Sequence, residues 1–206
     1  MNVGSSRFPA GEEPGVARIR DAALKIFARH GTEAASLRMV AVEAGVGIGL
    51  VQRHFGSKPG LIKAVDDHVM AVIAATIAEP RPGPPGDPVA EVGQRVTSLI
   101  GQHPHVVDYL GRALIDGAAI GSAIFDALVA TGKARWDQSR SQQLVRIDLD
   151  DTWAALNPLI LVLGTVILRG HVARHLPAPF NTPAQLRRWE NAVNALIREG
   201  QFRRGP

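Results

Sequence analysis

The chain has 206 residues and a mass of 22.0 kDa, enough for one domain or two small ones with a hydrophobic core. Hydrophobic residues make up 46% of the sequence and charged residues 20%, a balance typical of ordered globular proteins. The absence of cysteine excludes disulfide scaffolds, thiolate metal sites and cysteine nucleophiles. A formal net charge of +4 permits a nucleic-acid partner but does not demand one.

Nothing in the sequence indicates a targeting signal, a membrane span or a metal site, and we expect a cytoplasmic protein without a cofactor. Residues 1–14 lack the apolar segment of a secretory signal. The most apolar stretch, 159–168, is well short of the roughly 20 residues that a membrane-spanning helix needs. His171 and His175 lie four apart on a predicted helix, but no carboxylate accompanies them, so ordinary surface or interface histidines are the favoured interpretation.

The elements predicted along the chain are helices. Residues 1–14 are rich in Gly, Ser, Pro and Glu and predict a disordered tail. From Val16, apolar residues recur with the spacing of an amphipathic helix, which Gly31 is expected to end. Asp151 or Thr152 is the expected cap of a long helix near the C-terminus. The further helices are predicted at 37–44, 47–54, 58–78, 88–102, 104–115, 118–145, 150–175 and 183–199.

A proline- and glycine-rich segment divides these helices into two groups. Residues 79–88 contain too many prolines to sustain a helix or a central strand. We therefore predict an all-α protein with a small N-terminal unit at 15–75 and a larger helical bundle at 76–206. The helix at 58–78 alone spans both parts, which makes it the expected lever between them.

The stretch from Leu37 to Phe55 predicts a helix-turn-helix. Apolar residues at i, i+3, i+4 and i+7 give the first short helix one inward face, and Gly45 allows a sharp turn after it. Val51 and Phe55 anchor the second helix on the same base. The opposite, outward face has the shape needed to enter a major groove, and it presents Ile48, Gly49, Gln52 and Arg53.

Three segments, in the right order and spacing, carry a family resemblance: RDAALKIFARHG at 20–31, AVEAGV at 41–46 and HFGSK at 54–58. With them the chain resembles the TetR family of transcriptional regulators from Val16 to Met70. The resemblance implies a three-helix DNA-binding domain followed by a ligand-binding and dimerisation bundle. It also implies a homodimeric repressor that binds double-stranded operator DNA and is released by a small-molecule effector, whose identity the sequence does not give.

The predicted DNA contacts come partly from this resemblance and partly from side-chain chemistry. The resemblance implies phosphate contacts by Ser36 and Lys58, with Arg38 and His54 nearby. Glutamine can pair with adenine, arginine with guanine, and an apolar side chain can touch a thymine methyl. The chain departs from the family at Gly47 and Ile48, which stand where Ser and Lys are usual. The predicted set is Ser36, Arg38, Ile48, Gly49, Gln52, Arg53, His54 and Lys58.

The second part offers candidate residues for an effector pocket and for a dimer interface. Polar and aromatic side chains within apolar helices suggest a pocket, although plain core aromatics give the same pattern; they are His105, Tyr109, Arg112, Phe125, Trp136, Trp153 and Asn157. The helix at 150–175 is apolar nearly all round in its middle, so we expect it to be buried on more than one face. The candidate interface residues, whose alternative is an ordinary core, are Leu159, Leu163, Val166, Trp189, Val193 and Leu196.

The sequence pattern leaves two alternatives to a DNA-binding regulator. A helical ligand-sensing or interaction module that no longer binds DNA is supported by Gly47, Ile48 and the mild net charge. A helical enzyme is disfavoured, because no nucleophile–base pair, metal cluster or cofactor loop is recognisable in the sequence. The glycines at 45, 47 and 49 follow no predicted strand, so they do not indicate a dinucleotide-binding loop.

Overall fold

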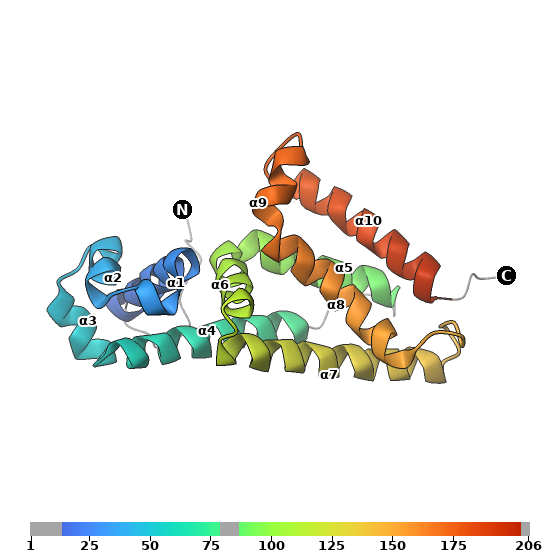
Figure 1. The fold of residues 1–206 in the computed structure, drawn as a ribbon, viewed down its shortest axis with the longest axis horizontal. Helices are drawn as coiled ribbons and strands as arrows, with labels where there is room; N and C mark the ends of the chain where they lie inside the picture. Colours follow the sequence, from blue (N-terminus) through green and yellow to red (C-terminus); the bar gives the residue numbers. More distant parts are fainter. Residues whose placement is uncertain (1–13, 79–86, 203–206) are drawn as a thin grey trace, which may run out of the picture. The chain divides into compact units, whose positions relative to one another are not determined.

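The computed structural model describes residues 14–78 and 87–202 (Figure 1). The expected tail before Pro14, and the proline- and glycine-rich segment up to residue 86, lie outside the described residues. Within them the regular structure consists of ten α-helices and one short 3-10 helix, with a single isolated bridge between Val145 and Phe202. The prediction of an all-α fold is confirmed.

The described residues divide into two compact units, the first ending at Ala71 and the second beginning at Val72. The boundary between the two units lies within a helix, α4 (Lys58–Ala78). The first unit also contains α1 (Pro14–Ala34), α2 (Leu37–Ala44) and α3 (Ile48–Phe55).

The core of the first unit draws on all four of its helices. Its fully buried side chains include Ile19, Phe27, Val40, Val51 and Leu61. Burial of each such side chain contributes about 1.5–3 kcal/mol, and α2 packs against both α1 and α3. The expected break at Gly31 is present within α1. Gly31 has φ 76° and ψ 162°, a conformation that favours glycine, and a short helical turn follows it.

The second unit contains α5 (Pro88–Gln102), α6 (Pro104–Ile115), α7 (Ala119–Ser141), α8 (Asp151–Ile167), α9 (Arg169–Val172), the 3-10 helix η1 (Ala173–His175) and α10 (Pro183–Gln201). Here α5 packs against α6 and α10, and α7 packs against α6 and α8. Three of these helices begin with proline, whose missing N–H costs nothing in the first turn.

Two of the predicted helices were too long. The helix expected to reach residue 145 ends at Ser141, because the chain leaves it through Gln143 at φ 58° and Val145 then bridges to Phe202. The helix expected at 150–175 breaks at Leu168, which separates α8 from the short turns that follow. Neither break is marked by a proline or glycine at the point where it occurs.

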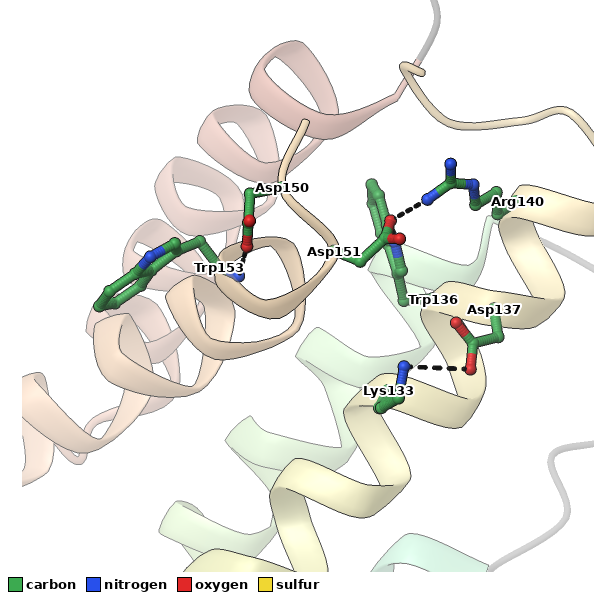
Figure 2. A network of polar contacts seen from close by, with 7 residues as sticks. All are labelled: Lys133, Trp136, Asp137, Arg140, Asp150, Asp151 and Trp153. Atoms are coloured by element: carbon green, nitrogen blue, oxygen red, sulfur yellow. Dashed lines mark hydrogen bonds and ion pairs between the residues drawn. The ribbon is translucent and has the colours of Figure 1, made fainter. Parts of the chain in front are cut away.

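A polar network fastens α7 to the start of α8 (Figure 2). The indole Nε1 of Trp136 donates to Asp151 Oδ1 at 2.7 Å, and Arg140 forms an ion pair with the same carboxylate. The hydrogen bond from Trp136, together with Arg140, holds the pKa of Asp151 below its ordinary value. Beside this network, Trp136 packs in a buried cluster with Val145 and Ala154.

The cap of α8 differs from the one predicted. Asp150 is the N-cap, and its carboxylate accepts a hydrogen bond from the backbone N–H of Trp153 at 3.0 Å (Figure 2). Asp151 is occupied instead by Trp136 and Arg140, and Thr152 is exposed within the first turn. The expectation that Asp151 or Thr152 caps this helix is therefore wrong by one or two positions.

No single helix within 14–78 and 87–202 is long and apolar enough to cross a membrane. Two helix pairs pass the length and composition test together, but they bend by 104° (α6 with α7) and by 67° (α8 with α9 and η1). Core helices of proteins that never enter a membrane pass the same test.

Two alanine variants distinguish Asp150 from Thr152 as the N-cap of α8. The Asp150→Ala variant is expected to lose about 1 kcal/mol of unfolding free energy, because an orphan N–H at the start of the helix loses its acceptor. Thr152→Ala is the matched control and should change stability by less than about 0.5 kcal/mol. Urea unfolding monitored by circular dichroism measures both, and an equal loss in the two variants would contradict the assigned cap.

Candidate functional site

The first helix of the helix-turn-helix is capped by one of the predicted phosphate-binding residues. Ser36 has extended backbone, and its Oγ accepts a hydrogen bond from the N–H of Met39 at 3.2 Å. Both Ser36 and Arg38 are exposed at the start of α2, while Val40, Ala41 and Ala44 turn inward and are buried. The N-terminus of a helix with exposed N–H groups is a favourable place for a phosphate oxygen.

The turn between α2 and α3 depends on Gly45. This residue lies in the left-handed region with φ 63° and ψ 40°, where an L side chain is strained. The N–H of Gly45 donates to Val42 O at 3.1 Å, and the N–H of Val46 donates to Ala41 O at 3.0 Å, so two of the last four carbonyls of α2 are satisfied. The next helix starts at once, because Gly47 is its N-cap and its carbonyl accepts from the N–H of Leu50 at 3.0 Å.

The second helix, α3, has a buried inner side. Its outer side, which is predicted to contact DNA, is exposed. Val51 is fully buried, and Phe55 is half-buried one turn later. Ile48 is 44% exposed, and Gly49, Gln52 and Arg53 are exposed with it on one side of the helix. Because α3 contains no acidic residue and carries Arg53 and His54 in its last turn, the exposed face combines apolar, amide and basic chemistry.

Lys58 has a structural contact that the sequence did not reveal. Its Nζ donates to the backbone carbonyl of Glu33 at 2.7 Å, which fastens the start of α4 to the end of α1. Ser57 accepts from the N–H of Gly60 at 3.3 Å and so supports the same helix start. The ammonium group of Lys58 has three donors, and the contact with Glu33 uses one of them.

A shallow hollow of about 400 Å³ lies beside α2, next to the predicted phosphate contacts. Val42, which is 76% exposed, is its most prominent apolar residue and was not singled out from the sequence. The spacing of apolar residues in α2 assigns Val42 to the outer face, so its exposure follows from the helical period. The hollow is lined by Ile26, Ser36, Arg38, Met39, Val42 and Glu43.

The seven candidates for an effector pocket lie in different surroundings. Tyr109 and Trp136 are buried in the core of the second unit. The guanidinium of Arg112 pairs with Asp116 at 2.7 Å, and the imidazole of His105 lies 4.0 Å from Asp108 on α6. Phe125 is half-buried on α7. These five remain single candidates in different surroundings.

The other two candidates line a groove between α8 and α10. Trp153 is 57% exposed, and its ring points away from the Trp136 network (Figure 2). The groove has a volume of about 220 Å³ and is mostly apolar. Its lining comprises Leu149, Asp150, Trp153, Ala154, Asn157, Pro158, Leu161, Leu196, Ile197, Gly200 and Gln201.

The predicted interface residues divide into buried and exposed ones. Leu163 and Val166 are buried within the unit, where Val166 packs with Ile100, Val107 and Leu186, so both are unavailable to a partner. Trp189 packs against that cluster, and its Nε1 donates to Thr165 Oγ1 at 3.2 Å.

The remaining candidates lie nearer the surface: Leu159 and Val193 are half-buried, and Leu196 is 63% exposed. Within a single chain, α8 leaves one apolar face uncovered. This exposed apolar surface, the α8 face, consists of Trp153, Ile160, Leu161, Ile167 and Leu168.

Comparison with known proteins agrees with this architecture. A family model described as bacterial regulatory proteins, tetR family, matches residues 19–65. The chain is 34% identical over 122 residues to the HTH-type transcriptional regulatory protein RaaS of Mycobacterium tuberculosis, covering 59% of this chain and 55% of that protein. It is 35% identical over 115 residues to the HTH-type transcriptional repressor Rv3405c of the same species, covering 56% and 54%. These matches span about half the length of the curated relatives.

Solved structures extend the similarity of fold over nearly the whole chain. A TetR family transcriptional regulator from Chloroflexus aurantiacus superposes with a TM-score of 0.74 at 18% identity, covering 96% of each chain. SmeT, the repressor of a multidrug efflux pump of Stenotrophomonas maltophilia, superposes with a TM-score of 0.64 at 19% identity, covering 92% of this chain and 91% of that one. Fold and site define an all-helical helix-turn-helix protein. Residues 19–65 match the tetR family of bacterial regulatory proteins, and the chain shares its fold with TetR family regulators of known structure.

Two glycine substitutions test the local geometry of the helix-turn-helix. Gly45→Ala is expected to lower the unfolding free energy by about 1–2 kcal/mol, because alanine is strained at positive φ. Gly49→Ala is the matched control: the space around Gly49 is open and the residue is helical, so stability should rise by about 0.5–1 kcal/mol. Thermal and urea unfolding give both values, and a loss of equal size in the two variants would contradict the described turn.

Proposed function

We propose that this protein is a homodimeric transcriptional repressor that binds operator DNA through α3 and releases it when a small molecule binds the second unit. The observation that carries the proposal is the exposed face of α3, held on the fully buried Val51 and free of acidic residues. The family match over 19–65 covers this element. Such a regulator acts where the chromosome is, so we place it in the cytoplasm.

The chemistry of α3 and α2 supports a division of labour in DNA binding. Gln52 and Arg53 carry the groups that recognise adenine and guanine in the major groove, and Ile48 is suited to a thymine methyl. Ser36, Arg38, His54 and Lys58 are placed at helix ends, where contacts with phosphate oxygens fix the register of a protein on DNA. In this proposal Gly49 lets the backbone of α3 approach the groove closely.

The α8 face supports a dimer built from a second copy of the chain. Large apolar side chains that remain exposed along one helix mark an interaction surface, because soluble monomers rarely leave such patches uncovered. Leu196 on α10 extends the surface, and α8 and α10 pack against each other within the chain. A dimer that binds DNA in this way presents its two α3 helices to successive major grooves, about 34–36 Å apart.

Release by an effector follows from a shift between two conformations of the dimer. The two conformations differ in the spacing of the α3 helices. A ligand with higher affinity for one conformation shifts the population toward it, by an amount set by the difference in affinity. Helix α4 crosses the boundary between the two units and is the proposed lever. Trp153 and Asn157, in the groove between α8 and α10, are retained as candidate contacts of an apolar or amphipathic molecule.

Arg53 is the most direct test of the reading face. Arg53→Ala is expected to weaken binding to an operator, selected from a random DNA library with the unchanged protein, by about 10- to 100-fold, since a bidentate base contact contributes about 1–3 kcal/mol. Arg187→Ala removes an exposed arginine from α10 and serves as the control. Fluorescence anisotropy measures both affinities, and equal binding by Arg53→Ala and the unchanged protein would show that Arg53 does not contact the operator.

A charge on the α8 face tests the dimer. Leu161→Glu is expected to convert the protein to a monomer at micromolar concentration, because the carboxylate would be buried without a partner. Leu144→Glu places the same charge on an apolar residue of similar exposure in the loop before α8, and should leave the dimer intact. Light scattering after size-exclusion chromatography gives the two masses; a dimeric Leu161→Glu would move the interface elsewhere.

A further inference from the structure

The outer side of α8 follows a repeat of four and three residues. Trp153, Asn157, Ile160 and Ile167 are exposed along it, and Gly164 is half-buried. Steps of four, three, four and three residues form one continuous seam along a helix, which is the pattern by which two helices pair side by side. The residues of α8 that are buried in the core of their own chain lie outside this seam.

The exposed residues of α8 are also symmetric about the middle of the helix. Ile160 and Leu161 lie at the midpoint, and Trp153 lies as far before it as Leu168 lies after it. In a dimer with a two-fold axis, a residue that contacts a second position of the partner is matched by the reverse contact. An antiparallel pair of α8 helices centred on this midpoint therefore sets Trp153 of each copy opposite Leu168 of the other.

The same symmetry places the polar residue of the seam opposite the smallest one. Asn157 lies as far before the midpoint as Gly164 lies after it. A Cβ added at Gly164 would meet nothing within 4 Å, so the space above this part of the helix is open. The amide of Asn157 fits there without holding the two helices apart. A single asparagine in an apolar seam fixes the register, because other registers set its amide against apolar side chains.

The two ends of the α8 face have complementary shapes. Near the start of α8, the groove of about 220 Å³ is lined by Trp153 and Leu161 together with Leu196 of α10. At the other end, Ile167 and Leu168 are exposed apolar side chains. Antiparallel helices bring these side chains to the groove of the other copy, whereas parallel helices bring groove to groove.

The two ends differ in charge as well. At the start of α8, Asp148, Asp150 and Asp151 outnumber the two arginines that pair with them. Residues 152–189 contain no acidic residue. Beyond α8 come two exposed arginines and two exposed histidines, of which the first pairs with Asp108: Arg169, His171, Arg174 and His175. Antiparallel pairing brings the acidic end of one copy to the basic end of the other, whereas parallel pairing brings like charges together.

We propose that two copies of this chain pair their α8 helices antiparallel, with the two-fold axis at the level of Ile160 and Leu161. Leu168 of each copy then covers the groove between α8 and α10 of the other. This pairing rests on the homodimer of the proposed function and adds its orientation and register. It also places the candidate effector contacts Trp153 and Asn157 between the two copies, so that an effector in the groove touches both and acts on the dimer directly.

Cysteine cross-linking tests the orientation, because the sequence contains no cysteine and an introduced one supplies the only thiol. Ile160→Cys, next to the axis, is expected to give a covalent dimer with a short bismaleimide. In an antiparallel pair, residue 153 lies about 22 Å along the helix from its own counterpart, and so does residue 168. Trp153→Cys or Leu168→Cys alone should therefore give little product. A mixed dimer of the two, isolated with different tags, should give at least tenfold more.

Leu144→Cys, in the exposed loop before α8, is the negative control. Light scattering first gives the mass of each variant. Strong cross-linking of Trp153→Cys or Leu168→Cys to its own counterpart would show parallel pairing and overturn the proposal. A dimeric protein in which Ile160→Cys gives no product would contradict the pairing alone. An unchanged protein that is a monomer would contradict the homodimer of the proposed function as well.

Fluorescence quenching tests whether the groove is covered. Trp153 is exposed in the single chain, whereas Trp136 is buried and Trp189 is half-buried. Quenching by acrylamide therefore reports chiefly on whether Trp153 is shielded. The quenching constant should be at least twofold higher in the monomeric variant Leu161→Glu than in the dimeric control Leu144→Glu. Equal constants in a monomer and a dimer would show that the second copy leaves Trp153 uncovered.

Discussion

The proposed DNA interface depends on the burial of Val51, on the inner side of α3. An eight-residue helix is far too short to be stable alone in water, so α3 exists because its inner face is buried. The turn at Gly45 brings the chain to that position. Ser36 is the N-cap of α2 and Gly47 is the N-cap of α3. Because one side of α3 is fixed in this way, the other side is free to carry residues chosen for recognition and not for stability.

The second unit is held together in a different manner. Its helices are joined by small buried clusters, one around Val166 and one around Trp136, and by polar fastenings at the helix ends. Gln201 at the end of α10 donates to the carbonyl of Ala154 at 2.8 Å, which secures that end of α10 to α8. Such a unit leaves large apolar side chains exposed within one chain, and the α8 face is where this is clearest.

The sequence predicted the fold better than it predicted the surfaces. The bounds of α2, α4, α5 and α6 agree with the predicted ranges, since glycine or proline marks the breaks between them. The break at Leu168 and the end of α7 carry no such mark, so the sequence pattern extended both helices. The exposed residues of α3 could be predicted from the sequence. When the apolar side of a short amphipathic helix is buried, only the opposite side can be exposed.

In α8 the periodicity gave no such guidance. A helix that is apolar nearly all round does not reveal which side faces its own chain, and two of the candidate interface residues, Leu163 and Val166, are buried in the core of the second unit. The hydrogen bond from Lys58 to Glu33 depends on tertiary packing between residues far apart in the sequence. Helical spacing alone contains no information about contacts of this kind.

The central claim is that α3 reads DNA as part of a dimer, and one binding measurement tests it most directly. The purified protein is titrated against the DNA that flanks its own gene, at low and at moderate salt, with the mass of the complex determined at saturation. We expect a dimer to bind a specific site. Its affinity for this site should fall steeply as the salt concentration rises, because phosphate contacts release counter-ions. No binding at low salt, either to this DNA or to any sequence recovered from a random library, would contradict it.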